Sequence, residues 1–111
     1  MNKEQIFAAL AAEVRELEVK ALGAVVRFQK FSGKARDEFF AAVRDGDKST
    51  SNFEASIVAA TVVDETGAPV FSREDLDGLR AINADALTEL AMHSLSVNKI
   101  GGDAEAAAAK N

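Results

Sequence analysis

The hydrophobic pattern changes period along the chain, and it starts with a period of two. Between residues 15 and 21, apolar side chains such as Leu17 and Val19 alternate with charged ones, as in a half-buried strand. Residues 24–31 form a second alternating run, and Gly23 separates the two. This arrangement predicts a β-hairpin. Because an isolated hairpin is marginally stable in water, we expect it to pack on other elements.

Two helices are predicted in the middle of the chain. Ser32 can cap a helix over residues 33–44, in which apolar positions recur at helical spacing. Ser51 and Glu54 match a capping box for a second helix, which should end near Gly67 because glycine can adopt a positive φ. The apolar face of this helix, which we expect to be largely buried, consists of Phe53, Ile57, Val58, Ala60 and Val62.

Two further helices complete the pattern. Pro69 disfavours helix just before it, and Ser72 then begins a helix that Gly78 should keep short. Asn83 caps the last helix, which runs to about Val97. Its inward positions are Leu87, Leu90, Ala91 and Ser94. The whole pattern predicts a mostly α-helical α+β fold, with an N-terminal β-hairpin packed on a bundle of three to four helices.

The two ends of the chain differ from the middle. Residues 1–13 form an Ala-rich extension suited to a short or frayed helix, with Ile6, Phe7 and Leu10 as its apolar positions. Residues 14–99 are expected to form a single domain. Residues 100–111 are rich in Gly and Ala and have no pattern that could be buried, so we expect a flexible tail.

Composition excludes several functions. The net charge of −5 disfavours binding to nucleic acid through a basic surface. No stretch approaches the roughly 20 apolar residues of a membrane span, so we expect no membrane association. The absence of cysteine removes disulfides, thiolate ligands and cysteine nucleophiles, and it fits a reducing cytosol. All seven aromatic residues are Phe, so we expect a core without indole or phenol groups.

Catalytic and metal-binding patterns are lacking. His93 is the single histidine, lies off the inward stripe of the last helix, and is interpreted as a neutral surface residue. The spacing of Asp45, Asp47 and Ser49 suggests a calcium loop, but Thr50 stands where such a loop needs glycine and Ser56 where it needs glutamate. We therefore expect no enzyme activity, no metal and no cofactor.

Exposed apolar side chains are the remaining candidates for function. Four phenylalanines lie near the hairpin and the first main helix: Phe28, Phe31, Phe39 and Phe40. Core packing is the simpler interpretation, and because Phe39 and Phe40 are adjacent, one of them should be only partly covered. The alternative is a groove for an amphipathic helix. Met92 projects away from the inward stripe and suits an adaptable contact surface.

The order of segments resembles the tail assembly chaperones of long-tailed bacteriophages (siphophages). The resemblance covers roughly residues 14–98. The first motif is residues 26–39, in which the end of the hairpin leads into a helix that contains Arg-Asp-Glu-Phe. The second is the apolar segment of residues 57–67, which ends in Val-Asp-Glu-Thr-Gly. The third is the helix start Phe-Ser-Arg-Glu-Asp within residues 69–76. A last helix, over residues 87–98, and a small polar tail follow.

The resemblance implies a function. Such chaperones bind the long, aggregation-prone tape measure protein in the host cell cytoplasm, keep it soluble before the tail tube forms around it, and are absent from the mature virion. A longer form, made by ribosomal frameshifting, is thought to recruit the tail tube protein. The three codons of the last residues, 109–111, can contain a slippery heptamer for backward slippage, which reading the gene sequence would test. A homo-oligomer is possible.

Two other functions fit the composition. One is a structural morphogenesis protein of the head-tail connector kind, which would be retained in the virion. The other is a small acidic regulator that binds a host protein. Gene context separates them, because a chaperone gene should lie between a tail tube gene and a long coiled-coil reading frame.

Overall fold

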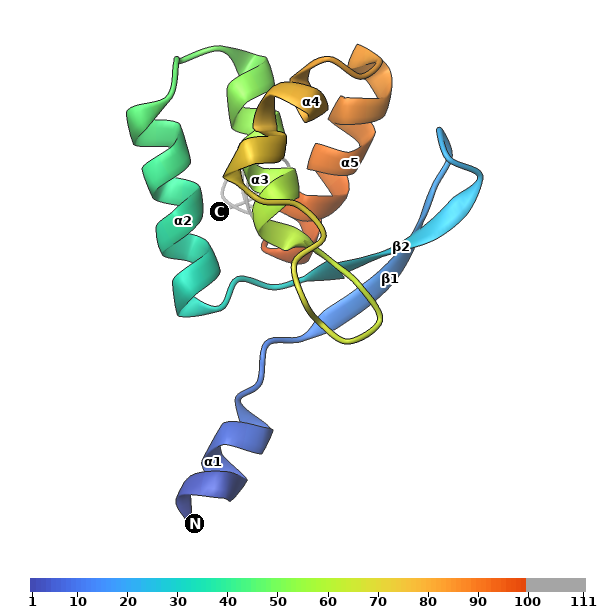
Figure 1. Cartoon of the computed structure of the whole chain (residues 1–111). Coiled ribbons are helices and arrows are strands. Elements are labelled where there is room, and N and C mark those ends of the chain that lie inside the picture. The colour runs from blue at the N-terminus through green and yellow to red at the C-terminus, as the bar shows by residue number, and fades with distance from the viewer. Residues whose placement is uncertain (100–111) are drawn as a thin grey trace, which may run out of the picture.

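The N-terminal helix stands apart from the rest of the molecule. The computed structural model describes residues 1–99, so the tail predicted for 100–111 lies outside the described residues. Helix α1 (Lys3–Ala9) begins with a capping box, in which Gln5 N–H donates to Asn2 Oδ1 at 2.8 Å and Asn2 N–H donates to Gln5 Oε1 at 2.9 Å. None of its residues is buried, and Figure 1 shows it at the end of a short link.

The predicted hairpin is confirmed. Strand β1 (Val14–Val19) pairs antiparallel with β2 (Ala24–Gln29). Gly23 lies in the connecting turn at φ +62°, a conformation that residues with a Cβ rarely adopt. The alternation read from the sequence holds at the ends of the strands, since Val19 and Phe28 are both fully buried against the helices.

A third strand was not predicted. Strand β3 (Val62–Val63) lies beside β2, with Phe28 opposite Val62 and Arg27 opposite Val63, which gives the strand order β1-β2-β3. The prediction that the preceding helix continues to about residues 64–67 is therefore wrong, because α3 ends at Thr61. Two β-branched residues pair with the open side of β2 instead of prolonging the helix. Gly67 does adopt a positive φ, of +86°, but in the turn that follows β3.

Helix α2 (Gly33–Asp45) has the predicted start, since Ala35 N–H donates to Ser32 Oγ at 3.0 Å. The start of α3 (Thr50–Thr61) differs from the prediction. Asn52 N–H donates to Ser49 Oγ at 3.2 Å, so Ser49 is the cap and the prediction of Ser51 is wrong.

The cap at Ser49 follows from contacts outside the helix. Ser51 Oγ accepts instead from Arg80 Nε at 2.9 Å, so this hydroxyl is held on another element. Asp47 accepts from Ser49 N–H at 2.9 Å, while Asn52 Nδ2 donates to the Asp47 carbonyl at 2.9 Å. These bonds close the turn between α2 and α3 and place Ser49 at the helix start.

The last two helices match the predictions. A 3₁₀ turn, η1 (Arg73–Asp75), leads into the short α4 (Leu76–Arg80). Helix α5 (Ala84–Val97) is capped by Asn83, whose Oδ1 accepts from two backbone N–H groups. All four predicted inward positions of α5 are buried. Within residues 1–99, no helix is long and apolar enough to cross a membrane.

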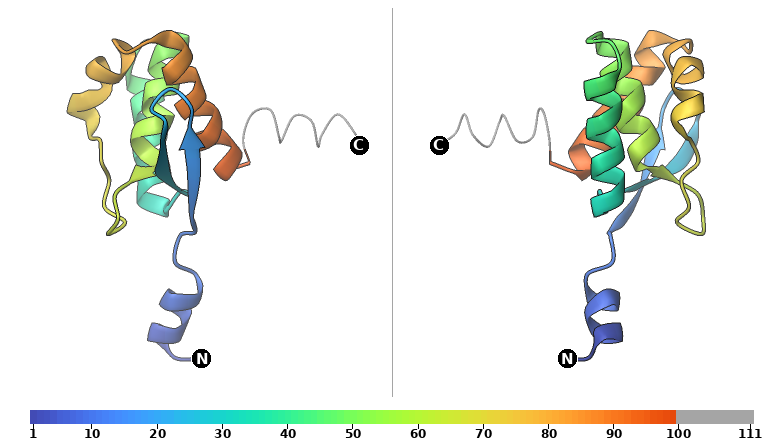
Figure 2. Two further views of the ribbon diagram at one scale, coloured as in Figure 1. Left: turned by 90° about the vertical axis from the view of Figure 1, so that its right-hand side faces the viewer. Right: turned by 60° about the vertical axis from the view of Figure 1, so that its left-hand side comes forward.

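Helix α3 is the centre of the core. It packs on α2, α4 and α5, and six of its residues are buried, which confirms the expectation of a largely buried helix. Inside the core, Thr61 Oγ1 lies 2.6 Å from Ser94 Oγ and joins α3 to α5. The hairpin lies against α5, as the left view of Figure 2 shows. The α+β fold with a hairpin on a helical bundle is thus confirmed.

The outer edge of the sheet belongs to β1. Lys30 N–H donates to the Glu13 carbonyl at 2.8 Å, so by alternation the backbone groups of Glu16 and Glu18 point outward. Glutamates at both positions discourage a further strand from adding there. Helix α5 covers the far end of this edge, where His93 Nε2 lies 3.1 Å from the Glu18 carbonyl oxygen.

Candidate partner-binding surface

Four phenylalanines meet where β2 leads into α2 and α3. Phe39 is at the centre, stacked on Phe31 with ring centroids 5.5 Å apart and edge-on to Phe53 at 5.6 Å. Phe40 lies next to it at 5.7 Å. Such separations are typical of favourable aromatic pairs. We call Phe31, Phe39, Phe40 and Phe53 the aromatic cluster.

The aromatic cluster is half buried and half open. Phe39 is 5% exposed and Phe31 is partly covered, so these two rings form its base. Phe40 is 56% exposed and Phe53 is 37% exposed. The expectation that one of the adjacent phenylalanines is only partly covered is confirmed. Large aromatic side chains fixed by a buried base are a common form of protein-binding anchor.

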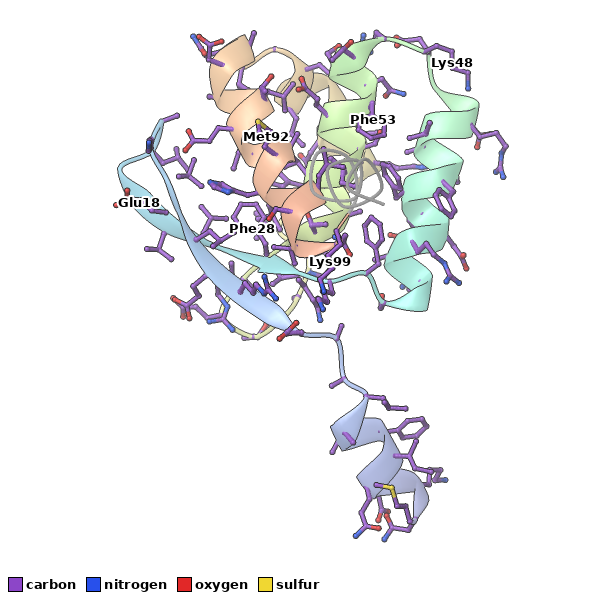
Figure 3. All side chains as sticks on the ribbon, turned by 180° about the vertical axis from the view of Figure 1, so that it is seen from behind. Glu18, Phe28, Lys48, Phe53, Met92 and Lys99 are labelled. Atoms are coloured by element: carbon purple, nitrogen blue, oxygen red, sulfur yellow. The ribbon has the colours of Figure 1, made fainter. Side chains whose placement is uncertain are left out.

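Phe28 is not part of this cluster. Its side chain is fully buried between the hairpin and α5, as Figure 3 shows, and its ring meets the His93 ring edge-on at 5.5 Å. The structure therefore places Phe28 in the core. Met92 lies on α5, outside the aromatic cluster, and its side chain is 63% exposed.

The aromatic cluster contains Phe53, which was not among the predicted binding residues, and does not contain Phe28, which was. The apolar face of α3, which includes Phe53, was expected to be largely buried. Phe53 lies in the first turn of α3, where neighbouring elements leave its ring partly open (Figure 3). A signal in the sequence was the distance of Phe53 from the middle of the helix, because terminal turns are covered less completely.

A cleft lies between β2 and the segment after β3. This cleft has a volume of about 620 Å³. Its floor is formed by Val26, Val62 and Leu90, and Leu22, Val25 and Val70 are the exposed apolar residues at its rim. None of the residues of the aromatic cluster lines it.

His93 joins α5 to the hairpin. Besides its contacts with Phe28 and the Glu18 carbonyl, its Nε2 lies 3.8 Å from Glu89 Oε2, and its side chain is 29% exposed. His93 lies off the buried stripe of α5, as interpreted from the sequence, but its contacts with the hairpin give it a structural role that was not expected. The sequence could not show this, because the hairpin that covers the imidazole is distant in the chain.

Glu89 holds the tip of the hairpin. Its carboxylate accepts from the backbone N–H groups of Lys20 at 2.6 Å and Ala21 at 3.0 Å. These two hydrogen bonds lower the pKa of Glu89 from its ordinary value of 4.5, and the nearby His93 and Lys20 side chains add a smaller effect. The role of Glu89 is thus to fix a turn.

The acidic residues resembling a calcium loop have structural partners. Asp47 accepts from Ser49, which lowers the pKa of Asp47, and its Oδ2 lies 3.0 Å from Arg80 Nη2. Asp45 pairs with Arg44 at 3.1 Å, which lowers the pKa of Asp45. In the part of the chain that the structure describes, no group of three or more His, Cys, Asp or Glu residues could hold a metal ion.

Comparison with solved structures identifies the architecture. The chain aligns with the structure of the bacteriophage HK97 tail assembly chaperone at a TM-score of 0.59, over 86% of this chain and 98% of that chain. The fold is that of a phage tail assembly chaperone. Sequence identity is 18%, so the likeness is one of fold. The resemblance inferred from the order of motifs is confirmed at this level.

Sequence comparisons alone do not lead to this fold, because no protein-family model and no curated protein sequence matches the chain. The solved structure with the tail assembly chaperone fold is that of an assembly protein rather than an enzyme. On this chain's version of the tail assembly chaperone fold, the aromatic cluster and the cleft are two separate apolar surfaces.

Proposed function

We propose that this chain is a tail assembly chaperone that binds the tape measure protein, keeps it soluble in the host cell cytoplasm and is absent from the finished virion. The fold shared with the HK97 tail assembly chaperone supports this proposal most strongly. The absence of a catalytic residue pattern in the sequence also supports binding without chemistry. Residues 14–99 would act as the chaperone domain.

The aromatic cluster is the proposed client-binding site. Tape measure proteins are long and helical, and an amphipathic helix presents apolar side chains at spacings of three and four residues. The rings of Phe40 and Phe53 are exposed on a base formed by Phe31 and Phe39. They can therefore enter the apolar stripe of a client helix without first losing much rotamer freedom. Met92 would extend the contact along α5.

The test is co-expression with the tape measure protein encoded by the same phage. We expect the unaltered chain to increase the soluble yield of the client. Phe40→Ser and Phe53→Ser should each weaken binding by about tenfold or more, as expected for an aromatic anchor. Ile82→Ser is a matched control, because Ile82 is 40% exposed and lies outside the aromatic cluster.

Two results would contradict the proposal. An unchanged soluble yield in the presence of the chain would exclude the chaperone function. Binding that is lost equally in Ile82→Ser and in the two Phe variants would exclude the aromatic cluster as the site. Mass spectrometry of purified particles adds an independent test, because a head-tail connector protein would be found in the virion and a chaperone would not.

A longer product made by ribosomal frameshifting is proposed to recruit tail tube subunits. The gene sequence tests this part separately. A slippery heptamer followed by an open overlapping frame is the expected result. Without either of them, tube recruitment would need another explanation, while client binding by the chain itself would stand.

A further inference from the structure

Strand β2 has an unpaired edge beyond the point where β3 ends. Strand β3 pairs with Arg27 and Phe28, and the chain then turns at Asp64, whose N–H donates to the Ala68 carbonyl at 2.8 Å. By strand alternation, the backbone N–H and C=O of Val25 point in the same direction as those of Arg27. In the described part of the chain, neither group of Val25 has a hydrogen-bond partner. At this point β2 presents a donor and an acceptor to an additional strand.

The cleft between β2 and the segment after β3 lies along this unpaired edge. Val26, Val62 and Leu90 form its apolar floor, and Leu22 and Val70 are exposed at its rim. Its volume of about 620 Å³ lies in the range of sites that enclose several apolar groups. Figure 1 shows the hairpin extending past the loop that follows α3. A partner that pairs with the edge therefore has an apolar surface beside it to cover.

An extended segment fits this surface better than a helix does. A helix satisfies its backbone groups by internal hydrogen bonds, so it would leave those of Val25 unpaired. A strand can pair with both groups, and its own side chains alternate between the two faces of the sheet. Val25 and Val26 point to opposite faces and both line the cleft. Alternate side chains of a bound strand would therefore meet an apolar side chain on either face.

The charges that line the cleft favour a basic partner. Three carboxylates, from Glu16, Asp64 and Glu65, and one guanidinium group, from Arg27, give the lining a net charge of −2. Arg27 Nη1 lies 3.0 Å from Glu16 Oε1, so these two charges neutralise each other. Within the described residues, Asp64 and Glu65 form no ion pair. They are free to attract lysine or arginine side chains of a partner.

We propose that the cleft binds an extended, basic segment of a partner protein, which adds to the unpaired edge of β2 as a short strand. The segment pairs its backbone with Val25 and covers the apolar floor with alternate side chains, and its lysine or arginine residues lie beside Asp64 and Glu65. None of the residues of the aromatic cluster lines the cleft. This strand-binding site is therefore separate from the proposed site for a client helix.

Synthetic peptides test the site directly. The probe is a fluorescently labelled heptapeptide, Lys-Val-Thr-Val-Thr-Val-Lys, whose β-branched residues favour an extended chain. Fluorescence anisotropy should show saturable binding to the unaltered protein that weakens as salt is added. A peptide with glutamate in place of both lysines should bind at least tenfold more weakly. The same loss is expected for the basic peptide N-methylated at its five central residues, because it lacks the donors needed for strand pairing.

Variants of the protein locate the bound peptide. Glu65→Lys should weaken binding of the basic peptide and strengthen binding of the acidic one, each by about fivefold. Val25→Pro removes the N–H of the unpaired edge and should weaken binding of the basic peptide at least tenfold, whereas Val25→Thr retains this N–H and should bind within about threefold of the unaltered chain. Phe40→Ser, in the aromatic cluster, is the control and should bind normally. Circular dichroism checks that each variant is folded.

Four results would overturn the proposal. The first is no binding of the basic peptide to the unaltered protein. The second is equal binding of the N-methylated peptide, which would indicate an apolar pocket without strand pairing, and this result decides even where Val25→Pro fails to fold. The third is equal binding of the basic and acidic peptides. The fourth is a peptide affinity that falls as the protein concentration rises, because a second copy of the chain would then occupy the cleft.

Discussion

Replacing Phe28 should destabilise the protein severely. A phenylalanine buries about 150–250 Å², and at about 25 cal/mol per Å² its burial contributes up to about 4–6 kcal/mol. Phe28 is fully buried. Alanine retains part of the contact but leaves a cavity, so Phe28→Ala should cost about 3–5 kcal/mol. The edge-on contact with His93 is lost in addition.

That loss is large for a chain of 111 residues, whose stability should be about 5–15 kcal/mol. At about 4–8 °C for each kcal/mol, the melting temperature should fall by about 12 °C or more. Thermal unfolding followed by circular dichroism measures it. Phe40→Ala is the control, because its ring is 56% exposed, and it should change stability by about 0.5 kcal/mol or less.

The two variants separate a core role from a binding role. If Phe28→Ala melts within a few degrees of the unaltered protein, the assignment of Phe28 to the core is refuted. If it stays folded and yet no longer binds the client, Phe28 belongs to the binding site after all. We expect the opposite pattern for Phe40, with binding reduced and stability kept.

Predictions for four other variants concern stability. Glu89→Gln should remove stability that is present above the ordinary glutamate pKa of 4.5 and is lost as pH falls through the lowered pKa of Glu89, so the melting temperatures of variant and parent should converge as the pH falls below that lowered pKa. Gly46→Ala should destabilise by about 1–3 kcal/mol, because its Cβ would lie 2.7 Å from the Ala42 carbonyl oxygen. Gly33→Ala, with open space around it, should stabilise by about 0.4–1 kcal/mol, and urea melts that rank the two glycine variants otherwise would contradict both. Ser94→Ala should cost about 1 kcal/mol and no more, because the Thr61 hydroxyl keeps the Ile57 carbonyl as an acceptor at 2.7 Å, and a loss above about 3 kcal/mol would show an unsatisfied group.

The parts of the fold that the sequence predicts are those fixed by local chemistry. The hairpin follows from a period of two around Gly23, and α5 follows from its cap at Asn83 and its inward stripe. The strand formed by Val62 and Val63 was not predicted, because no residue close to them in the sequence excludes a helix. Their strand exists because β2, more than 30 residues earlier in the chain, offers a free edge.

The candidate site was predictable only in part for the same reason. Helical spacing shows that the side chains of Phe39 and Phe40 point in different directions, so one of them should be only partly covered. Which of the two is exposed depends on the position of α3, which the sequence does not show. Phe31 follows the end of β2, so the direction of its side chain cannot be read from the strand alternation. Phe28 obeys that alternation, and its burial follows from the strand itself.

The acidic edge of β1 has a consequence for the proposed chaperone function. Exposed phenylalanines on a small domain normally invite amyloid-like stacking, which needs an unpaired strand as its template. Here Glu16 and Glu18 charge that strand and His93 covers its end. If the chain binds a helical client as proposed, this charged edge would keep the client from pairing with the sheet there.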